Sequence, residues 1–179
     1  MSRIQSIRTL ISASIAALAM LPAFAQSQDL PASTPVASTL DYRMNEHVIQ
    51  VPAGPGDVLL ETTVFQPDGA GPFPLIVINH GKDPGRPSLQ TRDRFYHMAS
   101  VFVKRGYAVM VPMRQGFSKS GGRYRDRGCD MTANGYTQAE DIRATLDYAR
   151  QQPWIDGARM IVAGQSYGGL AAIALGTEA

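Results

Sequence analysis

The stretch MIVAGQSYGGLAAIAL, residues 160–175, decides how this chain is expected to fold. An apolar run typical of a strand leads into Gly164-Gln165-Ser166-Tyr167-Gly168, and a second apolar run, typical of a helix, follows it. Strand, G-x-S-x-G and helix in this order are the context of a nucleophile elbow. That turn is so sharp that glycines are needed two positions before and after the serine. The same letters also describe an ordinary Gly/Ser turn, so the rest of the chain must decide between the two.

Strands and helices alternate upstream of this stretch. The expected strands are residues 42–51, 58–65, 75–78, 107–111 and 160–163. A Pro/Gly turn separates the first two, which favours an antiparallel pair, and the last three are continuous apolar runs typical of a parallel sheet. Helical periodicity at 91–105 and a capping box, Thr137 with Glu140, at the start of 137–151 place helices between these runs. The expected fold class is α/β, a three-layer sandwich with a mostly parallel sheet.

Three polar residues come directly after expected strands: His80, Arg114 and Ser166. Sites in parallel sheets form beyond the carboxyl ends of the strands, so these residues are expected at one edge of the sheet. The glycine-rich segment 114–134 reads as a long polar loop at the same edge.

With these motifs in place, the chain resembles the α/β-hydrolase superfamily, in particular its Ser-type dienelactone-hydrolase and prolyl-oligopeptidase-like branch. The resemblance covers about Leu59 to the end. It rests on His80-Gly81, on Arg114-x-Gly116-x-Ser118-x-Ser120-Gly121 and on Gly164-x-Ser166-x-Gly168-Gly169, in that order. Ser118 departs from the pattern, because the family often has glycine there. The resemblance implies an α/β-hydrolase fold from which the C-terminal strands are missing.

The resemblance also implies roles for individual residues. Ser166 would be the nucleophile that attacks an acyl carbon, and the backbone N–H groups of Tyr167 and Lys82 would form the oxyanion hole. Gly164 and Gly168 would be the elbow glycines. His80 and Arg114 are possible residues of the site edge, with His80 shaping its loop rather than carrying a proton.

The triad of this fold runs from serine to an acid and then to histidine. Residues 167–179 contain one acid, Glu178, and no histidine, while His47, His80 and His97 all lie upstream. We therefore expect the chain to be the N-terminal portion of a longer serine hydrolase acting on an ester or peptide, with little or no turnover by itself. The alternative is a non-catalytic α/β module that binds a ligand or partner at the same edge.

The N-terminus reads as a targeting segment. Residues 1–25 carry two arginines, an apolar run and the cleavage pattern Ala23-Phe24-Ala25, which together predict a signal peptide cleaved after Ala25. Residues 26–40 read as a flexible leader and 41–179 as the hydrolase domain. A secreted or periplasmic protein is expected. Cys129 is the one cysteine in the sequence, so no internal disulfide is possible; we expect a buried small hydrophobe, or else a free thiol.

Composition and charge limit the classes of binding partner that we expect for this chain. The formal net charge is +2, and without Arg3 and Arg8 of the targeting segment the chain holds 15 basic and 15 acidic residues. A polyanion-binding surface is not expected, so no nucleic acid is predicted. The basic residues of the polar loop read as solvated, with a contact for an anionic substrate group as the alternative; they are Arg114, Lys119, Arg123, Arg125 and Arg127. No cofactor, no metal and no membrane span after signal cleavage are predicted, and the oligomeric state is not.

Overall fold

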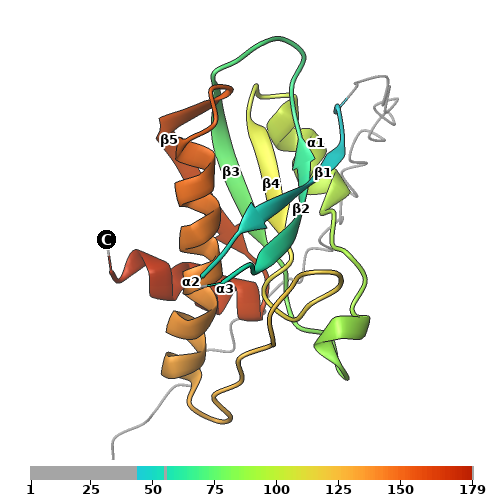
Figure 1. The fold of residues 1–179 in the computed structure, drawn as a ribbon. Coiled ribbons are helices and arrows are strands. Elements are labelled where there is room, and N and C mark those ends of the chain that lie inside the picture. Colours follow the sequence, from blue (N-terminus) through green and yellow to red (C-terminus); the bar gives the residue numbers. More distant parts are fainter. Residues whose placement is uncertain (1–43, 55, 179) are drawn as a thin grey trace, which may run out of the picture. The chain divides into compact units, whose positions relative to one another are not determined.

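The described part of the chain is built around one five-stranded sheet. The computed structural model describes residues 44–54 and 56–178, so the predicted signal peptide (1–25) and leader (26–40) lie outside it. The strands are β1 (His47–Pro52), β2 (Leu59–Phe65), β3 (Phe73–Asn79), β4 (Ala108–Pro112) and β5 (Ile155–Gly164). Figure 1 shows their order across the sheet, β1-β2-β4-β3-β5, with β5 at one edge and β1 at the other.

The pairing within the sheet confirms the predicted fold class. β1 and β2 form the expected antiparallel pair, and β2 is also antiparallel to β4. β4, β3 and β5 are mutually parallel, as their continuous apolar runs predicted. β3 therefore lies between β4 and β5, and the carboxyl ends of these three strands share one edge.

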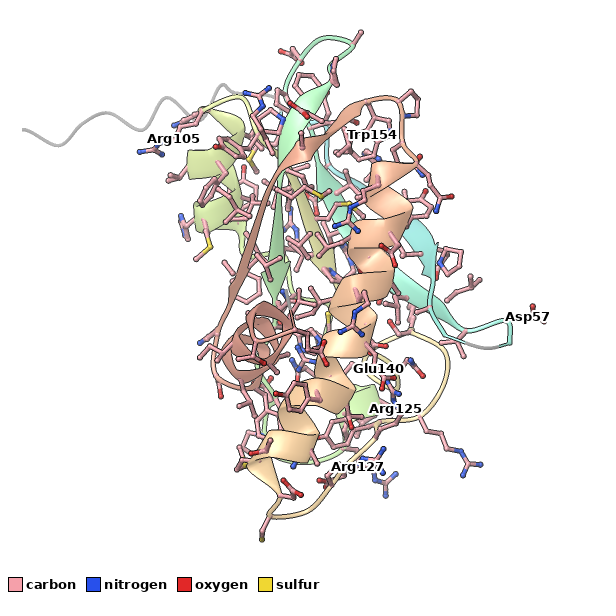
Figure 2. The ribbon with its side chains drawn as sticks, turned by 90° about the vertical axis from the view of Figure 1, so that its left-hand side faces the viewer. Asp57, Arg105, Arg125, Arg127, Glu140 and Trp154 are labelled. Atoms are coloured by element: carbon pink, nitrogen blue, oxygen red, sulfur yellow. The ribbon has the colours of Figure 1, made fainter. Side chains whose placement is uncertain are left out.

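Helices cover both faces of the sheet. They are α1 (Tyr96–Val103), α2 (Met131–Arg150) and α3 (Tyr167–Gly176), with a short 3₁₀ turn at Pro87–Leu89. Figure 2 views the sheet from the side and shows Arg105, just beyond α1, and Glu140, in α2, on opposite sides of it. The three-layer sandwich expected from the sequence is thus present.

Each face of the sheet has its own apolar core, because alternate side chains of a strand point to opposite faces. In β3, Leu75 and Val77 pack with Ile142 of α2 and Ala171 of α3. The intervening residues, among them Ile78, pack on the other face in a cluster that includes the α1 side chains. All of these β3 side chains are essentially inaccessible to solvent. A strand that is buried on both faces reads as a continuous apolar run for this reason.

Helix α1 is shorter than the predicted segment 91–105. It begins only at Tyr96, because Phe95 adopts a left-handed conformation with φ 43°. The residues before it are tied to the sheet rather than to a helix: Arg92 donates a hydrogen bond to the Thr63 hydroxyl, and the Asp93 N–H points to the Met113 sulfur at 3.2 Å. These tertiary contacts override the local helical periodicity.

Helix α2 begins earlier than predicted, so the capping box at Thr137 is wrong. Asp130 is the N-cap, and its carboxylate accepts the N–H of Ala133 at 2.9 Å. Thr137 is a buried residue inside the helix. Gly135 precedes the predicted helix start at Thr137 but lies inside α2, where α3 approaches: a Cβ there would lie 3.1 Å from the Cβ of Ala174. Within residues 44–54 and 56–178, no helix is long and apolar enough to cross a membrane.

Candidate active site

Ser166 occupies a strained turn between β5 and α3. Its backbone angles are φ 52° and ψ −121°, a combination that residues other than glycine rarely adopt. Such strain costs on the order of 1–3 kcal/mol and persists only where surrounding contacts impose it. The residue is exposed to solvent, and α3 begins immediately after it at Tyr167. The backbone therefore presents this serine at the edge of the sheet, in the geometry expected of an elbow.

The two glycines of the motif allow this turn to close. A Cβ on Gly164 would lie 2.2 Å from the carbonyl oxygen of Gly168. A Cβ on Gly168 would lie 2.2 Å from the carbonyl oxygen of Asn79 and 2.6 Å from that of His80. The first contact brings α3 against β5, and the second brings it against the end of β3. Any larger side chain at either position would push these elements apart.

The loop after β3 lies directly against Ser166. A Cβ on Gly81 would lie 3.4 Å from the Ser166 Cβ and 4.0 Å from its Oγ. The N–H of Lys82, the next residue, donates to no backbone carbonyl within the described ranges. The Tyr167 N–H belongs to the first turn of α3, where a helix supplies no acceptor for it. The structure thus brings together four residues that the sequence singled out: His80, Lys82, Ser166 and Tyr167.

His80 is a buried, neutral residue that joins the ends of β3 and β4. Its Nε2 accepts the backbone N–H of Arg114 at 3.0 Å, and its Nδ1 donates to the carbonyl of Gly81 at 2.6 Å. Burial, followed by the positive charge of Arg114, lowers the pKa of His80 to about 3. Both ring nitrogens are engaged, so this imidazole has no lone pair for a proton of Ser166.

Arg114 is fully buried, which contradicts the expectation that it belongs to a solvated loop. Its guanidinium donates to the carbonyl of His80 at 2.5 Å and to the Gln138 side chain at 3.0 Å, and it lies 5.3 Å from the Phe117 ring centroid. Burial lowers the pKa of this arginine to about 10, although nearby acidic groups, Asp141 first, oppose the change. The guanidinium donates to the main-chain carbonyls of His80 and Gly81, and no pattern in the sequence indicates such an interaction.

The other basic residues of the loop divide into two groups. Arg125 is half-buried and pairs with Glu140, beside it in Figure 2, and more loosely with Asp141 at 3.5 Å. Lys119, Arg123 and Arg127 are exposed, as expected of a solvated loop. Cys129 at the end of the loop is also exposed, so the expectation of a buried cysteine is wrong. It precedes the N-cap of α2 and packs against no core.

Two residues near the site were not identified from the sequence. The Gln90 side chain accepts the N–H of Asp83 at 2.9 Å and donates toward the Gly81 carbonyl at 3.4 Å. The Lys82 ammonium nitrogen lies over the ring of Tyr124, 5.7 Å from the ring centroid. Burial, with the neighbouring Tyr167 hydroxyl, raises the pKa of Tyr124 to about 12. Both residues lie in irregular segments without periodicity, so their roles depend on contacts that a sequence does not reveal.

No histidine hydrogen-bonds to Ser166 in the part of the chain that the structure describes. His47 belongs to β1 at the far edge of the sheet, and its Nδ1 lies 2.9 Å from the carbonyl oxygen of Asn45. His97 belongs to α1. Glu178, the acid that follows the elbow, pairs with Arg143 of α2. These residues do not form a triad with Ser166.

Comparison with known proteins agrees with this arrangement. Residues 55–179 match the family model described as X-Pro dipeptidyl-peptidase (S15 family). The quorum-quenching protein AidA of Acinetobacter baumannii is 30% identical over 133 residues, which are 70% of this chain and 40% of that protein. The chain thus spans less than half the length of this relative.

Solved structures show the same fold. The alpha/beta hydrolase GrgF from Penicillium sp. has 16% identity and a TM-score of 0.57, and the similarity covers 73% of this chain and 40% of that one. The acylaminoacyl peptidase of Pyrococcus horikoshii has 20% identity and a TM-score of 0.56, over 75% of this chain and 21% of the peptidase. The predicted α/β-hydrolase fold is therefore confirmed.

Proposed function

The chain belongs to the X-Pro dipeptidyl-peptidase (S15) family of α/β hydrolases, and we propose that it carries the nucleophile and oxyanion hole of a serine hydrolase acting on ester or peptide acyl groups. The observation that supports this most directly is the elbow: Ser166 is exposed in a strained conformation, with Gly81 packed against it. Strain of this kind at a solvent-exposed serine is a feature of functional sites.

In this proposal the Ser166 Oγ attacks the acyl carbon, and the carbonyl oxygen takes up the negative charge. The N–H groups of Tyr167 and Lys82 donate to that oxygen, and one such donor is worth about 3 kcal/mol. The alcohol or amine then leaves with a proton, and water releases the acyl group from the serine. The donors are backbone groups, so neither side chain is required for this step.

The proposed reaction also needs a general base, since a serine hydroxyl is a weak nucleophile at neutral pH. His80 is occupied on both nitrogens, and neither His47 nor His97 contacts the elbow. We therefore expect low turnover from residues 1–179 alone. The same observation favours a second candidate, in which this edge binds an acyl or carbonyl ligand without cleaving it.

The test is reaction of the chain with a fluorophosphonate, followed by mass spectrometry of the intact protein and its peptides. We expect slow labelling confined to Ser166 and its loss in Ser166→Ala. Ser118→Ala is the matched control, because Ser118 also has a positive φ, 49°, but does not lie in the elbow. Labelling elsewhere, or none, would favour the binding module. Rapid hydrolysis of a p-nitrophenyl ester that Ser166→Ala abolishes would contradict the expected low turnover.

Export is a further part of the proposal. The charge and apolar pattern of residues 1–25 supports secretion or a periplasmic location, with the mature chain beginning at Gln26.

A further inference from the structure

The carbonyl oxygen of Gly81 accepts hydrogen bonds from three side chains. His80 Nδ1 lies 2.6 Å from it, Gln90 Nε2 lies 3.4 Å away, and Arg114 Nη2 also lies 3.4 Å away. We refer to these three residues as the Gly81 clamp. All three are buried or nearly so, and Gln90 is the most exposed of them, at 9%. The Gly81 oxygen is therefore held toward the interior of the protein.

The Gly81 carbonyl and the Lys82 N–H belong to the same peptide group. A trans peptide is planar, and its C=O and N–H point in opposite directions. A clamp that holds the oxygen toward the interior therefore turns the N–H outward, where Ser166 lies exposed against Gly81. We infer that His80, Gln90 and Arg114 are positioning residues that aim the Lys82 N–H at the oxyanion, an inference that rests on the function proposed above.

The clamp residues are themselves held in place. The Arg114 N–H donates to His80 Nε2, which fixes the ring and leaves Nδ1 as the donor to Gly81. The Arg114 side chain donates to Gln138 and to the His80 carbonyl. Gln90 Nε2 lies 3.2 Å from the Asp93 carboxylate, and its oxygen accepts from Asp83. Rotation of the Gly81–Lys82 peptide would break several of these bonds together.

The clamp accounts for the burial of the Arg114 guanidinium. A buried cation is costly unless its hydrogen bonds are satisfied, and charge-assisted bonds are about twice as strong as neutral ones. Arg114 directs these bonds to two successive carbonyls, those of His80 and Gly81. Arg114 is fully buried, so it does not contact an anionic substrate group. Such a contact was the alternative that the sequence left open for the basic residues of the loop.

The test compares two phosphorus reagents that differ only in the atom placed in the oxyanion hole. In both a fluorophosphonate (P=O) and its thio analogue (P=S), the Ser166 Oγ–P bond forms, the P–F bond breaks, fluoride leaves and the hydroxyl proton passes to solvent. Sulfur accepts hydrogen bonds weakly, so the P=S reagent gains little from the Lys82 N–H. The ratio of the two labelling rates therefore reports on the hole, and the P=S rate alone reports on the serine.

Gln90→Met and Arg114→Lys are measured against Thr145→Val. Gln90→Met removes one clamp donor from an irregular segment, and Arg114→Lys keeps the charge but loses the fork of donors. Thr145 is as fully buried as Arg114, and its hydroxyl donates to the Asp141 carbonyl at 2.9 Å rather than to the Gly81 carbonyl. Circular dichroism checks each fold. If Arg114→Lys does not fold, Gln90→Met decides.

We expect each clamp variant to lower the P=O rate about tenfold or more relative to the P=S rate, since outright loss of an oxyanion-hole donor costs about 10²–10³ in rate. Thr145→Val should leave the ratio unchanged. Equal slowing with both reagents, or a ratio like that of Thr145→Val, would overturn the inference while the proposed nucleophile stands. If neither reagent labels Ser166 in the unsubstituted chain, the proposed function itself fails, and the inference with it.

Discussion

Acidification is expected to destabilise this fold mainly through His80. Its pKa in the folded protein is about 3, against 6.5 for an ordinary histidine, because the ring is buried and faces Arg114. The folded state therefore holds the neutral ring. The resulting stability is fully present above pH 6.5 and is lost as the pH falls toward 3.

The size of the effect follows from the same two values. At about 1.4 kcal/mol per pKa unit, the fall from 6.5 to about 3 amounts to about 5 kcal/mol in all, and about 3 kcal/mol of it is lost between pH 7 and pH 4. Burial raises the pKa of Asp93 and of Asp141, which lie beside the same network. Their contribution has the opposite sign, because it is lost as the pH rises, so the net change in the whole protein is smaller.

Urea unfolding at pH 7, 5.5 and 4, followed by circular dichroism, measures this change. The variant His80→Gln keeps an acceptor for the Arg114 N–H but does not titrate. It will be less stable at pH 7, and its free energy of unfolding should then fall by about 3 kcal/mol less than that of the unsubstituted chain on going to pH 4. If the two proteins lose the same amount, His80 is not the responsible group.

Three further results are expected. Gly168→Ala should cost at least about 2–3 kcal/mol of stability, because its Cβ would lie 2.2 Å from the Asn79 carbonyl oxygen. Thermal unfolding measures this cost, and Gly176→Ala is the control, because a Cβ there meets nothing within 4 Å. Asp130→Ala should cost about 1 kcal/mol in the same experiment if Asp130 caps α2, and an unchanged melting temperature would contradict that assignment. N-terminal sequencing of the exported protein should begin at Gln26, and a chain that still begins at Met1 would argue against signal cleavage.

Much of the fold could be predicted because its determinants are local. The continuous run Leu75–Ile78 indicates a strand buried on both faces, and the structure packs its alternate side chains into two separate cores. The elbow could be predicted for a similar reason. A Cβ on Gly164 or Gly168 would lie 2.2 Å from a carbonyl oxygen, so only glycine fits at these two positions, and the motif can be recognised in the sequence.

The helix boundaries could not be predicted, because distant contacts decide them. The sequence predicts a helix only from Thr137, whereas α2 begins at Met131 and includes Gly135, against which Ala174 of α3 packs. Residues 91–95 belong to the predicted helical segment, yet the Arg92 side chain donates to Thr63 of β2, and the backbone N–H of Asp93 points to the Met113 sulfur just after β4. Local propensity is a weak prior where such contacts compete with it.

The interior of the candidate site was also beyond prediction. Arg114 reads as one of five basic residues in a polar loop, and only the fold shows it buried among the carbonyls of His80 and Gly81. Backbone carbonyls are present at every position, so no residue pattern marks the ones that bind an arginine. Gln90 could not be identified for the same reason, because its side chain binds main-chain groups of Gly81 and Asp83.

The strand order has a consequence for how this sheet is assembled during folding. β3 follows β2 in the chain, yet its neighbours in the sheet are β4 and β5, which both come later in the sequence. The pairing of β2 with β4 joins residues 44 to 50 positions apart, from Phe65 with Val109 to Thr62 with Pro112, and closing such a loop has an entropic cost. The pairing of β3 with β5 joins residues 85 positions apart, such as Leu75 with Met160, so the loop that it closes is longer still. The edge that presents Ser166 is therefore held by the pairing with the largest loop-closure cost in this sheet.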